Sequence, residues 1–283
     1  MIKSIMPRIA AAIVSVVIII GGGFAAYVYV LSERIVHRQY EAPLQVVAVP
    51  TNAAAIVEGE RLAAIRGCSG CHGKNLAGAV FFDDFKQGRA TAPNLTSAVR
   101  DYSVAELARV IRHGVRHNGE GVQIMPSPMY YHLSDADLGK IIAYLRSLPR
   151  ADGLDYEFRP GPATRWLMVR GIWAPWPETV QQLGPRLTID DQSDPIARGE
   201  YLALTSCSEC HGQDLAGNPA FGIPPLPVMA AAYTPEQFDR FLSEGVAIGD
   251  RELPMMSRVA RSRFSHLHPE ERGAIYQYLI ATD

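Results

Sequence analysis

The longest apolar stretch of the chain lies near its N-terminus. No residue from Ile9 to Leu31 is charged, a run of 23 positions. A helix needs about 20 mostly apolar residues to cross the hydrocarbon core of a bilayer. The pattern therefore predicts a transmembrane helix over about 9–31, inside an N-terminal membrane anchor formed by residues 1–38.

A cleavable secretory signal is the alternative interpretation of this segment. Its apolar region would be only about 7–15 residues long and would end at a small-residue cleavage site. Residues 23–26, Gly-Phe-Ala-Ala, match such a site weakly, and we expect an uncleaved anchor. Lys3 and Arg8 precede the span while Arg34 and Arg38 follow it, so the positive charges do not fix its orientation.

Beyond the anchor, apolar residues recur at helical spacing in two similar stretches. The segment "YSVAELARVIRHGV" parallels "YTPEQFDRFLSEGV", with Ser103 and Thr234 placed as N-caps and Gly114 and Gly245 as C-terminal stops. Earlier in each copy, "EGERLAAIRG" parallels "ARGEYLALTS". Later, "HLSDADLGKIIAYLRSL" parallels "HLHPEERGAIYQYLIA", with Ser134 as a cap. The chain therefore contains a duplicated helical unit.

The two copies define the expected domains. Few positions alternate with the period of a strand, so we predict an all-α fold in which the transmembrane helix is followed by two tandem domains, at 54–150 and 195–283. Residues 39–53 are expected to form an extended tether. The linker, 151–194, is rich in proline and holds all three tryptophans. It is either a connector whose aromatic side chains pack on both domains or a docking surface for a partner subunit.

Composition narrows the possible partners. Over 283 residues, 48% are hydrophobic and 20% charged, which is typical of a folded protein. The formal net charge of -2 gives no reason to expect a nucleic acid partner. All four cysteines, Cys68, Cys71, Cys207 and Cys210, stand in the two copies of one motif. None remains for a separate disulfide or a catalytic thiol.

That motif is Cys-x-x-Cys-His, once in each copy. The sequences "CSGCHGKNLAG" and "CSECHGQDLAG" agree at eight of 11 positions. A zinc site built from both cysteine pairs would account for the thiols. However, the pairs lie 136 residues apart and the adjacent histidines would have no role. A thioredoxin-like dithiol belongs to a strand, helix and strand setting, which the repeats do not supply.

The same spacing is the signature of covalent haem attachment. Two thiols one helical turn apart match the two vinyl groups on one edge of the porphyrin, and the next residue then points toward the iron. Two covalently bound haem c groups would use all four cysteines, with His72 and His211 as iron ligands. We therefore expect two haem sites in the chain.

With these motifs the chain resembles the cytochrome c family. It is most similar in plan to membrane-anchored dihaem cytochromes with two class I-like domains, such as the cytochrome subunits of bacterial periplasmic dehydrogenases. The resemblance covers both repeats and implies a cytochrome c-like fold for each domain. It also implies a single-pass protein of the bacterial cytoplasmic (inner) membrane, with a short N-terminus inside and both haem domains in the periplasm.

The resemblance implies the remaining ligands as well. In the family, the second axial ligand is usually a methionine on the loop before the last helix. The first repeat offers Met125, which is followed by a proline, and its rival Met129. The second repeat offers Met256 and its neighbour Met255. The form of the two loops favours Met125 and Met256.

A proline carbonyl usually supports the ring of the proximal histidine in this family. Pro93 in "TAPNLT" and Pro224 in "IPPLP" are the candidates, with Pro225 as a rival for the latter. Most other histidines lie in polar surroundings and are expected at the surface. Two of them, His117 and His132, flank the first methionine loop and are alternative iron ligands.

The predicted function is electron transfer, with no catalytic residue in this chain. It would take electrons from a periplasmic dehydrogenase or respiratory complex and pass them to an acceptor such as a terminal oxidase. The alternative is a dihaem enzyme, a peroxidase or a thiosulfate-oxidising cytochrome, with one open or unusual haem site.

The two domains differ in charge. The first domain holds 12 basic and 9 acidic residues, and the second holds 7 basic and 11 acidic residues. The two domains are therefore expected to meet differently charged partners.

Overall fold

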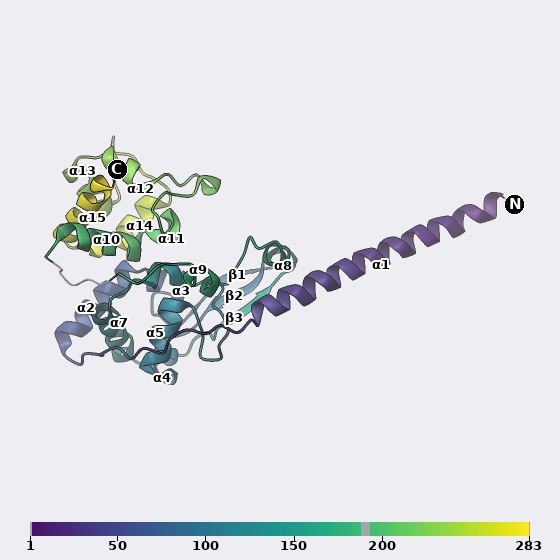
Figure 1. Ribbon diagram of the computed structural model, residues 1–283, viewed down its shortest axis with the longest axis horizontal. Helices are drawn as coiled ribbons and strands as arrows, with labels where there is room; N and C mark the ends of the chain where they lie inside the picture. Colours follow the sequence, from purple (N-terminus) through teal and green to yellow (C-terminus); the bar gives the residue numbers. More distant parts are fainter. Residues whose placement is uncertain (1, 188–192, 283) are drawn as a thin grey trace.

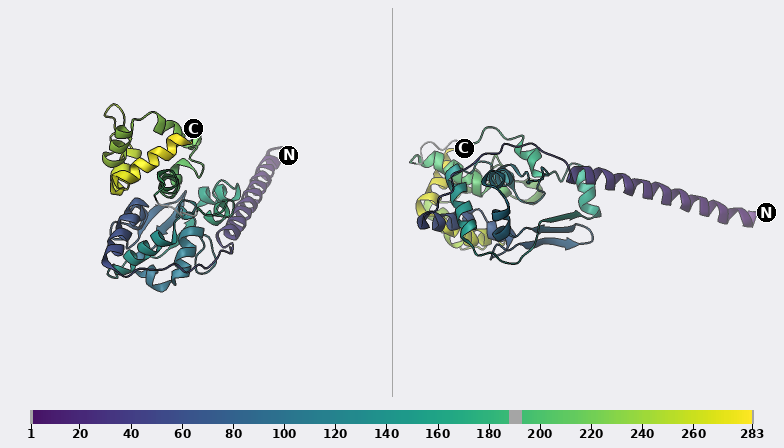
Figure 2. Two further views of the ribbon diagram at one scale, coloured as in Figure 1. Left: turned by 60° about the vertical axis from the view of Figure 1, so that its left-hand side comes forward. Right: turned by 90° about the horizontal axis from the view of Figure 1, so that it is seen from below.

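The computed structural model describes residues 2–187 and 193–282. A long helix, α1 (Ile2–Val36), projects from a body made of two lobes (Figure 1). The first repeat forms one lobe and the second repeat forms the other. The additional views show the lobes lying against each other and α1 leaving from the first of them (Figure 2).

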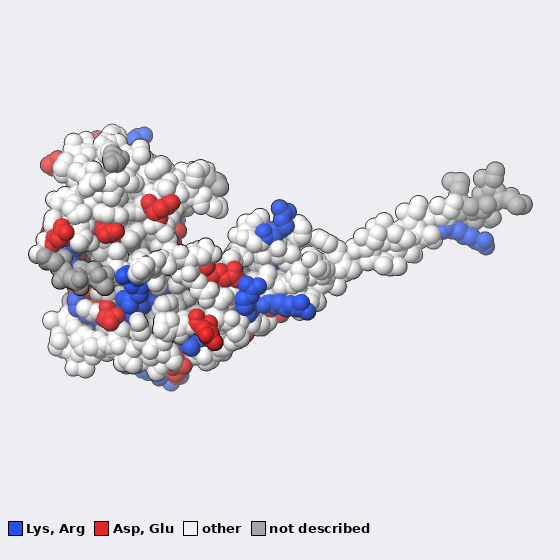
Figure 3. Space-filling model, viewed as in Figure 1, with Lys and Arg blue, Asp and Glu red and all other residues white. Residues whose placement is uncertain are grey.

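Helix α1 has the length and composition of a membrane span. Its stretch from Arg8 to Val36 is 29 residues long, and none of the most apolar part of it is buried within the protein. In Figure 3 most of this helix is white, with blue atoms toward its N-terminal end. About 20 residues are enough for one crossing of a bilayer. By length and composition, α1 is a candidate for such a crossing.

A short helix between the repeats, α8 (Pro162–Val169), holds the C-terminal part of α1. Arg165 Nη1 donates a hydrogen bond to Ser32 Oγ at 2.7 Å, and Arg165 Nη2 lies 2.7 Å from Glu33 Oε1. The Trp166 ring packs on Phe24 with the ring centroids 5.5 Å apart. Side chains as well as the backbone therefore join α1 to the first lobe.

In the first lobe, the first and last helices of the repeat cross. These are α2 (Ala53–Ile65) and α7 (Asp135–Ser147). Gly59 allows the crossing, because a Cβ at this position would lie 2.0 Å from the carbonyl oxygen of Lys140. Between them, in chain order, are α3 (Cys68–His72), α4 (Leu95–Asp101), α5 (Val104–His113) and α6 (Ser127–Tyr130).

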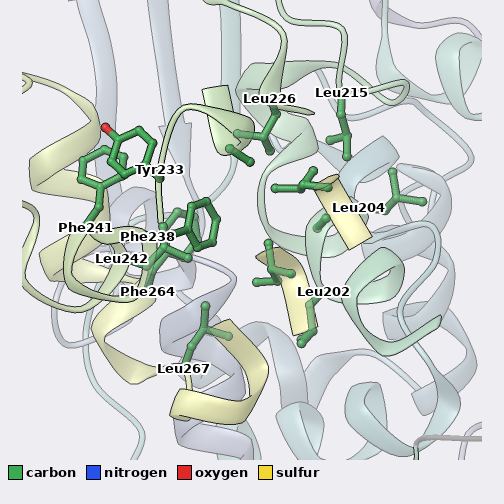
Figure 4. Close-up of a cluster of buried hydrophobic side chains, with 14 of the residues drawn as sticks. Leu202, Leu204, Leu215, Leu226, Tyr233, Phe238, Phe241, Leu242, Phe264 and Leu267 are labelled. Atoms are coloured by element: carbon green, nitrogen blue, oxygen red, sulfur yellow. The ribbon is translucent and has the colours of Figure 1, made fainter. Parts of the chain in front are cut away.

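The second lobe repeats this plan with α10 (Pro195–Ser206) crossing α15 (Pro269–Ala281). A Cβ at Gly199, the counterpart of Gly59, would lie 2.1 Å from the carbonyl oxygen of Ala274. Leucines and aromatic side chains fill its core (Figure 4). The intervening elements are α11 (Ser208–His211), η1 (Pro219–Phe221), α12 (Leu226–Ala231), α13 (Pro235–Glu244), α14 (Met256–Ser262) and η2 (Phe264–His266).

The helix ends predicted from the sequence are confirmed. Ser103 and Thr234 each accept a hydrogen bond from the backbone N–H three residues later, in complete capping boxes. Gly114 and Gly245 follow these helices with φ of 69° and 76°, the left-handed conformation that glycine adopts without strain. Ser134 caps α7. Local hydrogen bonds and glycine conformations thus fix where these helices begin and end in both copies.

The all-α prediction is wrong for one part of the first lobe. An antiparallel sheet with the order β1-β2-β3 is built from β1 (Ala79–Asp84), β2 (Gly88–Ala92) and β3 (Glu157–Pro160). The Asp84 carboxylate closes the first turn by accepting hydrogen bonds from the N–H groups of Lys86 and Gln87. A register shift between Val80 and Phe82 interrupts the alternation of β1, which weakens the strand pattern in the sequence.

The expected linker at 151–194 contributes much of its length to the first lobe. It supplies β3, α8 and α9 (Trp176–Val180), while residues 188–192 lie outside the described part of the chain. The Trp173 ring contacts Phe82 and Phe158, with centroids 6.3 and 6.2 Å away. The ring contacts of this tryptophan and of Trp166 are therefore with the first lobe and α1.

The lobes meet at a buried carboxylate. The Glu271 side chain is 2% exposed and lies 2.6 Å from Arg61 Nη1 of α2 and 2.6 Å from Arg198 Nη2. Burial alone would raise the pKa of Glu271, but hydrogen bonds from Arg61 and from the His268 N–H outweigh it and lower that pKa. The carboxylate therefore stays ionised at neutral pH and ties α2 to the second lobe.

Candidate functional site

The first Cys-x-x-Cys-His motif forms a short helix, α3, directly after α2. Gly67 before it and Gly73 after it have φ of 73° and 79°, so the chain turns sharply at both ends. Cys68 and Cys71 are one helical turn apart and therefore lie on the same side of the helix. Both cysteines line one cavity together with His72.

His72 is oriented by a backbone carbonyl. Its side chain is buried, at 8% exposure, and its Nδ1 lies 2.7 Å from the carbonyl oxygen of Pro93. A carbonyl oxygen only accepts hydrogen bonds, so Nδ1 carries the proton and Nε2 keeps its lone pair. Burial lowers the pKa of His72. The ring is therefore neutral at pH 7 and able to bind a metal ion.

The cavity in the first lobe has a volume of about 620 Å³ and a mainly apolar lining. This size falls within the range of about 300–1,000 Å³ that is typical of cofactor pockets. Met125 lines it from the loop before α6. Met129, its rival, is fully buried in the core, and its sulfur accepts a hydrogen bond from Arg263 Nη2 at 3.7 Å. The structure thus brings Met125, but not Met129, to the cavity wall.

The two alternative histidine ligands occupy different places. His117 lines the cavity, and its Nδ1 is 2.5 Å from the Tyr102 hydroxyl. His132 is buried, and its Nδ1 accepts a hydrogen bond from the Leu187 N–H at 3.1 Å. Of the two, only His117 shares the cavity with His72.

One wall of this cavity was missed by the sequence analysis. Phe81 and Thr91 of the sheet line it, as do Tyr156 and Phe158 from beyond α7. The Arg116 guanidinium carbon lies 4.1 Å from the centroid of the Tyr156 ring. The aromatic and β-branched residues at 80–91 were the available signal for strands. Strand β3, about 70 residues away in sequence, completes this wall by pairing with β2.

The second motif has the same local geometry in a more open setting. His211 ends α11, and Gly212 follows with φ of 82°. Its Nδ1 lies 3.2 Å from the Pro224 carbonyl oxygen, so this contact involves Pro224 rather than its rival Pro225. Burial lowers the pKa of His211 as it does for His72. Here Pro224 and Cys210 are both exposed.

The two methionines of the second lobe differ in position. Met256 is the first residue of α14 and packs, partly buried, against the core of the lobe. Met255 is 68% exposed. Of the two, Met256 is the one that faces inward, as expected for an axial ligand.

The thiols do not have the properties of a redox dithiol or a zinc site. Burial raises the pKa of Cys68 to about 11 and that of Cys207 to about 12, whereas reactive dithiols have lowered pKa values. Among the residues that the structure describes, no three His, Cys, Asp or Glu side chains converge as a metal-ion site. Each lobe instead supplies two thiols, a neutral imidazole and a thioether, the donor set that fits covalently bound haem.

Comparison with known proteins gives a consistent result. The cytochrome c family model matches residues 56–149 and 196–282. The gluconate 2-dehydrogenase cytochrome c subunit of Pantoea cypripedii is 32% identical over 177 residues, which are 56% of this chain and 38% of that protein. The fructose dehydrogenase cytochrome subunit of Gluconobacter japonicus is 28% identical over 182 residues, 57% of this chain and 36% of that protein.

A diheme cytochrome c-type protein of Cereibacter sphaeroides is 26% identical over 255 residues, 78% of this chain and 83% of that protein. The chain thus spans less than half the length of the gluconate and fructose dehydrogenase subunits. The family model covers both repeats, and together its two matches exceed half of the chain. The chain therefore belongs to the cytochrome c family, whose members transfer electrons by means of covalently bound haem c.

Proposed function

We propose that this chain is a membrane-anchored dihaem c-type cytochrome that carries electrons from a dehydrogenase to a downstream acceptor. The observation that carries the proposal is the duplication of one site geometry. In each lobe a Cys-x-x-Cys-His helix directs the histidine Nδ1 to a proline carbonyl, at 2.7 Å for His72 and 3.2 Å for His211. Met125 lines the first cavity from the loop before α6, and Met256, the first residue of α14, packs against the core of the second lobe.

The arrangement of these side chains suits electron transfer rather than bond breaking. Haem iron held between histidine and methionine exchanges one electron while both ligands stay bound. The Pro93 carbonyl fixes the ring of His72, so that its Nε2 lone pair is aimed in one direction. The mainly apolar wall of the first cavity limits the access of water. These features keep the site nearly unchanged between oxidation states.

The names of the relatives support a dehydrogenase as the electron donor. Two of them are cytochrome subunits of a gluconate 2-dehydrogenase and a fructose dehydrogenase. We infer that a separate catalytic subunit oxidises its substrate and passes electrons to one of the two lobes. The opposite charge balance of the lobes, 12 basic against 9 acidic residues and 7 against 11, favours different partners for each.

Helix α1 supports the proposed location. Its apolar surface is exposed along most of its length, and lipid would cover that surface in a single-pass anchor. The cytochrome c lobes would then lie on the periplasmic side of the bacterial inner membrane. When the anchor is replaced by a cleavable secretory signal, the lobes should appear in the soluble periplasmic fraction. Persistence in the membrane fraction after alkaline carbonate washing would contradict the role of α1.

The proposed haem sites are tested by cofactor content and ligand spectra. Full-length protein purified in detergent should yield about two haems per chain in a pyridine haemochrome assay. Met125→Leu and Met256→Leu should each remove half of the weak long-wavelength charge-transfer band of methionine-ligated ferric haem. Met129→Leu and Met255→Leu are the matched controls and should leave it intact. A high-spin site in the unmodified protein would favour the dihaem enzyme instead.

A further inference from the structure

The two Cys-x-x-Cys-His segments approach each other where the lobes meet. Arg66 Nη2 donates a hydrogen bond to Thr205 Oγ1 at 3.0 Å. These two residues hold the same place in the two repeats, two positions before the first cysteine of each motif. Equivalent points of the repeats therefore touch, and the C-terminal ends of α2 and α10 face each other across the interface.

One side chain of the second lobe contacts both segments. Arg263 Nε donates to the carbonyl oxygen of Ile65 at 3.1 Å, and its Nη2 lies 3.4 Å from the carbonyl oxygen of Ser206. Its Nη1 is 2.9 Å from Glu209 Oε2, inside the second motif. Arg263 also lines the first cavity together with Cys68. This guanidinium thus touches the backbone just before each pair of cysteines.

The interface is well shielded from water and rich in positive charge. The side chains of Arg66 and Arg263 are 1% and 15% exposed. The nearest carboxylate oxygen to Arg66 is that of Asp137, 3.9 Å away, and its Nε and Nη1 have no hydrogen-bond partner in the protein. Glu209, which pairs with Arg263, is one-third exposed. Solvent therefore screens the negative charge of Glu209 more than the two positive charges.

We propose that Arg263 is a positioning residue shared by the two haem sites, which fixes the two attachment segments relative to each other and, with Arg66, raises both reduction potentials. A positive charge in a poorly solvated place stabilises the form of a redox group that holds one more electron. The inference rests on the proposed dihaem function. It goes beyond that function by making the two potentials depend on one side chain.

The test is a spectroelectrochemical titration of the full-length, haem-loaded protein in detergent. In Arg263→Gln, the equilibrium constant for reduction should fall at both sites, by about tenfold, equivalent to 59 mV for a one-electron couple. Arg240→Gln removes the same charge from an exposed ion pair on α13 and should shift neither potential by more than a third of that. A fall at one site only, or an equal fall in the control, would overturn the proposal.

Two further variants separate charge from shape. Arg263→Lys keeps the charge and should restore most of both potentials, although the loss of the guanidinium fork should increase hydrogen exchange at the ends of α2 and α10. Glu209→Gln removes the paired negative charge and should raise both potentials, which gives a result even if Arg263→Gln fails to fold. Unchanged potentials in Arg263→Gln and in Glu209→Gln, with two haems bound, reject the role of Arg263 and leave the proposed dihaem function standing. Fewer than two haems in the unmodified protein reject the proposed function.

Discussion

The two attachment sites share one motif but differ in enclosure. His72 is buried and lies in a cavity closed by strands and helices. In the second lobe His211 is partly exposed, Cys210 and Pro224 are exposed, and the supporting contact is longer, 3.2 Å against 2.7 Å. The same motif therefore stands in a protected setting in one lobe and in an open setting in the other.

The cause is the length of one loop. The histidine and its supporting proline are 21 residues apart in the first lobe and 13 in the second. The longer segment folds into β1 and β2, and β3 joins them from the linker. A local insertion thus changes the solvent exposure of a site without altering its ligands. Under the proposed dihaem function, the different walls would give the two sites different potentials and different access to partners, because exposure affects both.

The two lobes share one helical scaffold and should respond alike to changes in it. A test of this scaffold has the largest expected effect. Gly59→Ala and Gly199→Ala place a Cβ 2.0 and 2.1 Å from a carbonyl oxygen of the crossing helix. Each should lower the free energy of unfolding of its own lobe by about 3 kcal/mol, because overpacking forces the helices apart. Hydrogen exchange resolved by lobe measures this. Gly273→Ala, with open space around it, is the control. If only one of the two variants destabilises its own lobe, the two helix crossings are not equivalent.

The lobes should respond differently to acid. Burial, helped by Arg112 and Arg186, lowers the pKa of His113 to about 4, whereas the matching position in the second lobe is Glu244, a surface residue. Between pH 4 and 6.5 the unfolded chain binds more protons at His113 than the folded one. The stabilisation that the neutral His113 side chain contributes to the first lobe is thus fully present above pH 6.5 and is lost as the pH falls toward 4.

Since His113 is only partly buried, we expect a loss of about 2 kcal/mol in the first lobe. Chemical denaturation at a series of pH values, monitored by exchange in each lobe, checks this. In His113→Gln the difference between the lobes over this pH range should shrink. If the second lobe loses as much stability as the first, His113 is not the cause.

Opening the first site should make it resemble the second. Tyr156 lines the cavity under Arg116, and Tyr156→Ala should admit water and lower the equilibrium constant for reduction at that site about threefold. Phe221→Ala changes an exposed ring between His211 and Pro224 and should have no such effect. Redox titration of both variants decides the matter, and equal shifts would show that enclosure is not what separates the sites.

The smallest expected effect concerns salt. The first repeat is basic and the second acidic by residue count. Reduction by a small anion should therefore slow at the first site and quicken at the second, each about twofold, as ionic strength rises from about 0.01 to 0.15 M. Stopped-flow absorbance, with each phase assigned by its midpoint potential, measures both rates. Identical salt dependence at both sites would show that the charge of the lobes does not distinguish them.

Much of each lobe could be predicted because its signals are local. Helix caps at Ser103 and Thr234, the stops at Gly114 and Gly245, and the repeated cysteine motif each act within a few residues. For these features the sequence pattern contains the physical cause. The histidine contacts with Pro93 and Pro224 span 21 and 13 residues, and they are expected from the resemblance to the cytochrome c family rather than from a local signal.

Other features depend on residues that are far apart in the chain. The sheet needs Gly88 opposite Pro160, and a register shift hides the alternation of β1. The contact of Arg263 with Ile65 joins positions 198 residues apart. No local pattern marks such partners, because the energy of each contact appears only after the lobes have packed.

Contacts between α1 and α8 attach the anchor to the first lobe by side chains. Arg165 binds Ser32 and Glu33, and Trp166 packs on Phe24, so rotation of the first lobe about the helix axis would break these contacts. In the proposed membrane, Phe24 would lie within the span at 9–31, and its contact with Trp166 would hold α8 at the lipid surface. A partner would then reach the same face of the first lobe at each encounter.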